Sequence, residues 1–206
     1  DGLLTEAESS VDGVEDSAEA PRRQTIVLVG VTGDGKSSTG NSLCGSETFV
    51  ASSGFASVTR QSEHVDYSYK GALWRVIDTV GLHDTDLSQQ EVIERFTSFA
   101  DLASDGIDAF LFIVRWGRFK PEHDAALDSF TANCGEAVLR HTILVFTHCS
   151  ETPENLHQVV ASTAPASLRS WVAKVQGVVG IENYPRPAQE ASSQPLPARE
   201  VLHQSL

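Results

Sequence analysis

The sequence predicts a three-layer α/β fold, in which a mostly parallel sheet of about six strands carries helices on both faces. Three observations support this fold class. Strand-like segments alternate with helix-like segments along the chain. Most of the strand-like segments are apolar throughout, as in parallel strands that are buried on both faces. The 206 residues, of which 40% are apolar, suffice for one domain with a full core.

The expected strands come from short apolar or alternating runs. TIVLVG is the first apolar run, and the alternating run EHVDYSY is joined to ALWRVID through Lys70-Gly71, which indicates a hairpin. DAFLFIV and HTILVFT are two further buried runs, and GVVGIE is the last. We therefore expect strands at residues 25–30, 63–69, 72–78, 108–114, 141–147 and 177–182.

Helix signals follow most of these strands. Gly45 is a suitable residue to end the first helix, and apolar residues at helical spacing predict the second. Pro121 lies in the first turn of the third helix, whereas Pro165 interrupts the fourth. The sequence thus predicts helices at 36–44, 89–103, 121–134 and 153–175, with loops at 46–61 and 79–88.

Composition divides the chain into three parts. Residues 1–20 hold seven acidic residues and no Lys or Arg, so we expect 1–22 to be a disordered acidic leader. Residues 23–184 are expected to form the folded domain. Residues 185–206 read as a Pro-rich tail in which Arg199 begins a final, truncated helix. Because the first residue is Asp1 rather than Met, we expect the chain to belong to a longer product.

Charge and composition exclude several function classes. The net charge of −13 disfavours binding to nucleic acid or to an anionic membrane surface. No run of apolar residues is long enough to span a membrane, although an anchor beyond Leu206 stays open. Cys44, Cys134 and Cys149 form neither a disulfide framework nor a zinc pattern, which favours a reducing, cytoplasmic location.

The most specific motif is GVTGDGKS, which fits the phosphate-binding pattern G-x-x-x-x-G-K-S/T between a strand and a helix. Glycines let successive backbone N–H groups point at phosphate oxygens, and the helix N-terminus adds its positive end. Lys36 would reach the β- and γ-phosphates, and Ser37 would offer its hydroxyl to Mg²⁺. The predicted nucleotide contacts in this loop are Gly30, Thr32, Gly33, Asp34, Gly35, Lys36, Ser37 and Ser38.

A second motif, DTVG, ends the strand at 72–78. Asp78 would hold Mg²⁺ beside Ser37, and the backbone N–H of Gly81 would meet a γ-phosphate. Thr59 lies in the long loop between the two motifs, where one hydroxyl is needed to bind Mg²⁺ when the γ-phosphate is present. The predicted metal ligands are therefore Ser37, Thr59 and Asp78.

Five segments together resemble a known family: GVTGDGKSSTGNSLCG, SVT, DTVGLHDT, RWGRFKPEHDAALDSF and TILVFTH. They are similar to the GTPases of immunity-associated proteins (GIMAP) and to their avirulence-induced plant relatives, over residues 24–184. The resemblance implies a P-loop GTPase (G domain) that binds GTP or GDP with Mg²⁺, with GTP ordering the loops 46–61 and 79–90. It also implies dimerisation through the nucleotide face.

Base recognition departs from the usual N/T-K-x-D pattern. The equivalent residues are Thr-His-Cys-Ser at 147–150, and Thr147-His148 resembles the chloroplast import-receptor GTPases. In those proteins a Glu-Asn pair after the last strand also serves the base, and Glu182-Asn183 stands there in this chain. Guanine requires a carboxylate that accepts two donors, for which Glu182 is the first candidate and Glu151 the second.

Hydrolysis has weak support in the sequence. Leu82 occupies the position of the glutamine that orients water in Ras-like enzymes, and His83 is a weak substitute, so we expect a low intrinsic rate. The resemblance implies that Arg118, or less favourably Arg115, faces a partner's phosphates. The predicted catalytic residues are Lys36, Thr59, Gly81 and Arg118. A non-hydrolysing scaffold or receptor module and an ATP-using P-loop protein remain as alternatives.

Overall fold

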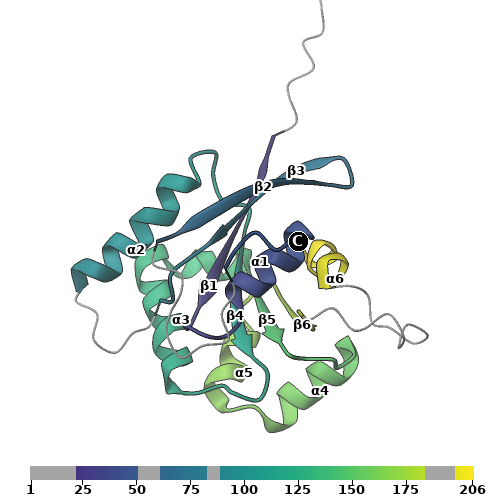
Figure 1. Ribbon diagram of the computed structural model, residues 1–206. Helices are drawn as coiled ribbons and strands as arrows, with labels where there is room; N and C mark the ends of the chain where they lie inside the picture. The colour runs from purple at the N-terminus through teal and green to yellow at the C-terminus, as the bar shows by residue number, and fades with distance from the viewer. Residues whose placement is uncertain (1–21, 51–60, 83–88, 184–197) are drawn as a thin grey trace, which may run out of the picture.

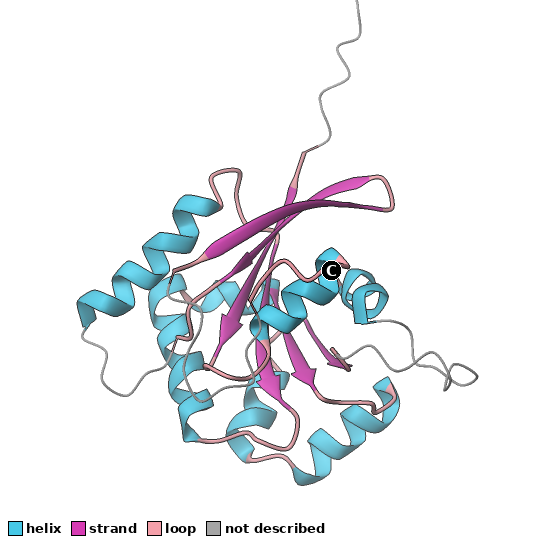
Figure 2. Cartoon of the chain, viewed as in Figure 1, coloured by secondary structure: helices cyan, strands magenta, loops and turns pink. Residues whose placement is uncertain are grey.

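A six-stranded sheet forms the central layer of the protein, and helices cover both of its faces (Figures 1 and 2). The computed structural model describes residues 22–50, 61–82, 89–183 and 198–206. Thr59, His83, most of the predicted leader and most of the Pro-rich tail lie outside these residues.

The sheet confirms the predicted fold class. Its strand order is β2-β3-β1-β4-β5-β6, and every neighbouring pair is parallel except the antiparallel hairpin β2–β3. The strand order reverses at β1, because the hairpin β2–β3 that follows it in the chain lies on one side of β1 and the later strand β4 lies on the other. The strands are β1 (Gln24–Gly30), β2 (Glu63–Tyr69), β3 (Ala72–Asp78), β4 (Ala109–Arg115), β5 (Thr142–Thr147) and β6 (Gly177–Ile181).

The helices divide between the two faces of the sheet. Buried residues of α2, α3, α4 and α5 share one core cluster, whereas those of α1 and α6 share the other. Figure 1 shows α1 and α6 side by side. The helices are α1 (Lys36–Cys44), α2 (Gln89–Leu102), α3 (Pro121–Cys134), α4 (Pro153–Thr163), α5 (Ala166–Val172) and α6 (Ala198–Ser205), with a 3-10 helix, η1, at Glu136–His141.

The side chains of β1 alternate between the two core clusters, which lie on opposite faces of the sheet. Ile26 and Leu28 are fully buried on the side of α1 and α6, and Val27 and Val29 are fully buried on the opposite side. Successive side chains of a strand point to opposite faces, so a strand covered by helices on both faces must be apolar at every position.

The observed elements differ from the predicted ones mainly at their ends. Each strand begins and ends within one residue of its predicted range, while the predicted helix at 153–175 is two helices. Pro165 is the N-cap of α5, since a proline ring cannot continue a helix but suits its first turn. The 3-10 helix η1 was not predicted; it begins after Gly135, whose φ of 81° ends α3.

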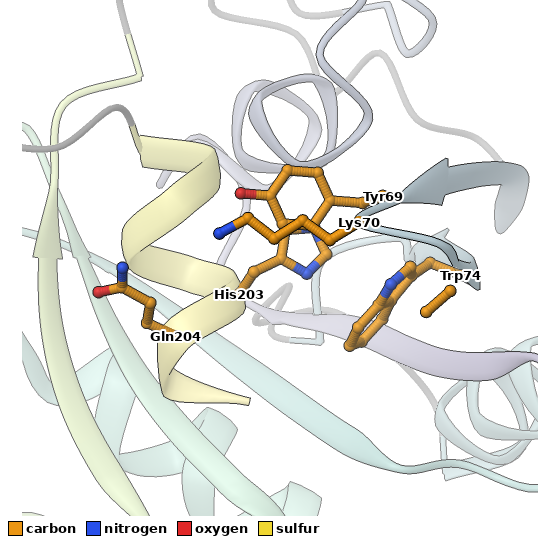
Figure 3. A pocket seen from close by; sticks show the side chains of 6 residues that line it. Tyr69, Lys70, Trp74, His203 and Gln204 are labelled. Carbon is orange, nitrogen blue, oxygen red and sulfur yellow. The ribbon is translucent and has the colours of Figure 1, made fainter.

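The last helix, α6, packs against α1 and the β2–β3 hairpin rather than extending into solvent. Leu202 is fully buried, and the ring of His203 stacks on Tyr69 with centroids 4.0 Å apart. Trp74 meets the same ring edge-on at 4.6 Å, and these side chains line a small cavity at the hairpin (Figure 3). No helix within the described ranges is both long enough and apolar enough to cross a membrane.

His203 makes the docking of α6 sensitive to pH. Burial, followed by the charges of Arg199 and Lys70, lowers the pKa of His203 from 6.5 to about 4. Between these pH values His203 is mostly protonated in the unfolded chain and mostly neutral in the folded chain. We therefore expect the free energy of unfolding to be highest above pH 6.5 and to fall by about 1 kcal/mol toward pH 4. This figure allows for solvent screening, because His203 is only half-buried.

Thermal unfolding at about pH 7.5 and about pH 5 measures this loss. The variant His203→Phe keeps an aromatic ring on Tyr69 but cannot titrate, so its Tm should fall less than that of the wild type. His157→Phe, on an exposed position of α4, should keep the wild-type response. An unchanged pH response in His203→Phe would contradict this assignment.

Candidate functional site

The loop between β1 and α1 has the backbone geometry that its glycines predict. Gly30 has a φ of 140°, and a Cβ there would lie 2.5 Å from the carbonyl oxygen of Ile113 on β4. Gly35 caps α1 in the left-handed region, with a φ of 101°. Both positions therefore require glycine, and the loop curls so that the N-terminus of α1 lies at the carboxyl edge of the sheet.

Lys36 lies inside this loop. Only 7% of it is exposed, and its ammonium donates to the carbonyl oxygens of Val31, at 3.0 Å, and Gly30, at 3.3 Å. A charged group held by the loop's own backbone is well placed for a polyanion within the same loop.

Ser37 and Asp78, the two predicted metal ligands within the described residues, are in contact. The Ser37 hydroxyl donates to Oδ2 of Asp78 at 2.6 Å, and Asp78 is 1% exposed. The parallel register places Asp78 beside Leu28, two residues before the end of β1. A hydroxyl and a carboxylate are hard oxygen donors, so this pair fits Mg²⁺, whose remaining ligands in such sites are phosphates and waters.

The second motif lies directly against the phosphate loop. A Cβ at Gly81 would collide with the side chain of Thr32 and would lie 2.9 Å from the backbone nitrogen of the same residue, so only glycine fits there. The N–H of Leu82 donates to the carbonyl of Gly30 at 3.1 Å, and the Leu82 side chain is 3% exposed within the core. The guanidinium of Arg95, on α2, donates to the carbonyl oxygen of Gly81. Sequence reasoning missed Arg95, because nothing distinguishes it from any other helical arginine.

Thr147, at the end of β5, joins the predicted base-recognition segment to the phosphate loop. It is fully buried, and its hydroxyl donates to the carbonyl of Asp34 at 2.7 Å. His148 follows with a φ of 54°, a left-handed conformation that turns the chain sharply. The N–H of Cys149 then donates to Ile181 at 3.1 Å, which fixes this turn to the end of β6.

His148 lies among the other predicted charged residues. Burial lowers its pKa, the positive charges of Arg115 and Arg118 lower it further, and the carboxylate of Glu182 opposes them. The structure therefore brings Arg118 and Glu182 to the same edge of the sheet as His148, although they come from different loops. Arg118 is exposed to solvent.

The residues around Glu182 are held by hydrogen bonds. The side chain of Asn183 donates to Thr39 at 2.9 Å and accepts from Ser42 at 3.0 Å, so it ties the end of β6 to α1. Glu151, the second candidate for the base, accepts a hydrogen bond from the amide of Asn155 on α4.

A buried contact joins the phosphate loop to α3, and the sequence did not predict it. Nε2 of His123 lies 2.7 Å from Oδ2 of Asp34, and the two residues are 3% and 7% exposed. Nδ1 of the same ring accepts the N–H of Lys120 at 3.0 Å. A single histidine in a helix carries no sequence signal for such a contact.

Comparison with known proteins identifies the family. The AIG1 family model matches residues 24–198. The chain belongs to the AIG1 family. This AIG1-family chain is 33% identical over 157 residues to immune-associated nucleotide-binding protein 9 of Arabidopsis thaliana, covering 74% of the chain and 46% of the relative. It is 34% identical over 140 residues to protein 7 of the same series, covering 64% and 45%. The AIG1-family chain thus spans about half the length of these curated relatives.

Solved structures share its fold. Toc33 from Arabidopsis thaliana in complex with GDP and Mg²⁺ superimposes with a TM-score of 0.62 and 25% identity, covering 81% of this chain and 73% of that one. Toc33 with Mg²⁺ and GMPPNP gives a TM-score of 0.66 at 22% identity, covering 90% and 85%. These likenesses confirm the P-loop GTPase architecture of the AIG1-family chain.

The hydrogen bond between Thr147 and Asp34 should stabilise the site measurably. Thr147→Val keeps the shape but removes the donor, so the buried carbonyl of Asp34 loses a partner. We expect a loss of about 1–3 kcal/mol in the free energy of unfolding, measured by denaturant titration. Thr147→Ser keeps the hydroxyl and should lose less. A larger loss in Thr147→Ser than in Thr147→Val would show that the methyl group, rather than the hydrogen bond, matters.

Proposed function

We propose that this chain is a guanine-nucleotide switch that binds GTP or GDP with Mg²⁺, hydrolyses GTP slowly and dimerises in a nucleotide-dependent way. The observation that carries the proposal is the phosphate loop, where buried Lys36 lies beside the contact between Ser37 and Asp78. Its membership of the AIG1 family, its relatives named as nucleotide-binding proteins and the Toc33 complex with GDP and Mg²⁺ support it.

The residues of the phosphate loop and of the segments beside it have separate chemical roles in this proposal. Backbone N–H groups at the start of α1 surround the phosphates, and Lys36 neutralises their charge. Ser37 and Asp78 would hold Mg²⁺, which supplies charge neutralisation at the β- and γ-phosphates when bound. Gly81 would present its backbone N–H to the γ-phosphate. Thr59 stays a predicted ligand outside the described residues.

We assign guanine recognition to Glu182 rather than Glu151. Glu182 is close enough to His148 to affect its pKa, at the edge where Thr147 contacts the phosphate loop. Glu151 instead bonds Asn155 on α4. A carboxylate at 182 would accept N1–H and N2–H₂ of guanine, and His148 would flank the ring. Asn183 positions this segment through its bonds to α1.

The position of Leu82 supports the slow hydrolysis in this proposal. Its side chain belongs to the core, so residue 82 offers no group to orient an attacking water. Arg118 is exposed beside the base-recognition turn, where it is accessible to a second copy of the chain. An arginine supplied by a partner would stabilise the charge that develops on the phosphates. The buried Leu82 equally favours a second candidate, a scaffold that assembles on nucleotide without hydrolysing it.

Base discrimination tests the assignment of Glu182. Glu182→Gln keeps the size but replaces the acceptor pair by an amide, so GDP affinity should fall roughly tenfold while ADP affinity stays unchanged. Competition of unlabelled GDP and ADP against a fluorescent nucleotide measures both affinities. Glu151→Gln is the matched control and should keep the wild-type preference. If Glu151→Gln loses the preference instead, the two roles are reversed.

Single-turnover GTP hydrolysis at increasing protein concentration separates the switch from the scaffold. For the switch, the rate constant should rise with concentration, because a partner supplies Arg118, and Arg118→Ala should stay at the low basal rate. Lys36→Ala should bind nucleotide too weakly for either behaviour. Phosphate release that is absent at every concentration would exclude the GTPase and leave the scaffold.

A further inference from the structure

The phosphate loop contains a negative charge of its own. Asp34 lies between Gly33 and Gly35, in the stretch whose backbone N–H groups would surround phosphates, and only 7% of it is exposed. Its carbonyl is held by the hydroxyl of Thr147 at 2.7 Å. A carboxylate that turned toward bound phosphates would oppose binding, because like charges repel strongly where little water separates them.

The hydrogen bonds of His123 define its protonation. Its Nδ1 accepts the N–H of Lys120, so this nitrogen carries no proton. Nε2 therefore carries the proton and donates to Oδ2 of Asp34 at 2.7 Å. The imidazole is the neutral Nε2–H tautomer, and Asp34 is a carboxylate whose Oδ2 is engaged.

Packing holds the imidazole in this position. His123 is 3% exposed, and its ring stacks on Phe119 with centroids 5.3 Å apart and an angle of 26° between the ring planes. It belongs to the first turn of α3, whose residues Ala126 and Phe130 are fully buried in the core. The donor that faces Asp34 is therefore fixed by a rigid helix, rather than by a mobile loop.

We propose that His123 is a positioning residue for nucleotide binding. By donating to the Asp34 carboxylate, it keeps this negative charge on the α3 side of the phosphate loop and leaves the loop's N–H groups to the phosphates. The inference rests on the proposed function, since it requires that a nucleotide binds in this loop. It adds that the charge of Asp34 is tolerated only because His123 restrains it.

Two substitutions separate this role from the capping of α3. Asn at 123 places an acceptor near the position of Nδ1, so His123→Asn keeps the bond from Lys120 and removes the donor to Asp34. His123→Gln places a donor near the position of Nε2 and loses the cap. We expect His123→Asn to weaken GDP binding roughly tenfold and to weaken binding of a GTP analogue more, because the analogue carries more charge. His123→Gln should stay near the wild-type affinity.

Removing the charge of Asp34 provides the decisive test of the positioning role of His123. Asp34→Asn combined with His123→Asn should restore the wild-type affinity, and high salt should shrink the defect of His123→Asn, because salt screens charge repulsion. Fluorescent-nucleotide titration gives the affinities, and thermal unfolding reports folding separately. His157→Asn, exposed on α4, is the matched control and should bind as the wild type does.

The outcomes distinguish the inference from the function on which it rests. If the wild type binds guanine nucleotide and His123→Asn binds equally well, the positioning role is refuted. It is also refuted if Asp34→Asn fails to restore affinity, because a structural role of His123 predicts that result. If the wild type binds no nucleotide, the proposed function fails and this inference fails with it.

Discussion

The parallel pairing of β1 with both β3 and β4 determines where the site lies. Three strands end at one edge, so the loops that follow them must meet there, as is usual where strand order reverses in an α/β sheet. At Gly30 the backbone of β4 approaches too closely for any side chain. The chain therefore leaves the sheet at a glycine, turns through the phosphate loop and enters α1 with Lys36 enclosed by its own backbone.

Asp34 connects three parts of this edge. Its carbonyl is bound by Thr147 from the end of β5, and its carboxylate is bound by His123 from α3. The loop is thus restrained from two elements that lie far from it in the sequence. A loop that is fixed in advance loses little conformational freedom when a ligand binds, which favours affinity. The proposed base site, beside Thr147, is held at a constant position relative to the proposed phosphate site.

Local patterns predicted most of the fold. The apolar runs identified the strands, and the phosphate-loop motif predicted that Lys36 and Ser37 would lie together, because its chemistry is contiguous in the sequence. Contacts between distant residues carried no such signal. His123 is 89 residues from Asp34, and Arg95 reaches Gly81 from another element, so neither was singled out. The docking of α6 depends on aromatic rings of the β2–β3 hairpin, which periodicity cannot pair with it.

The buried position of Leu82 limits how this protein can change. A glutamine at 82 would have to place its amide in the core, at a cost of about 1–3 kcal/mol, or pull the DTVG segment away from Gly30. A single substitution therefore cannot install the water-orienting group of Ras-like enzymes without disturbing the packing of α2 and β1.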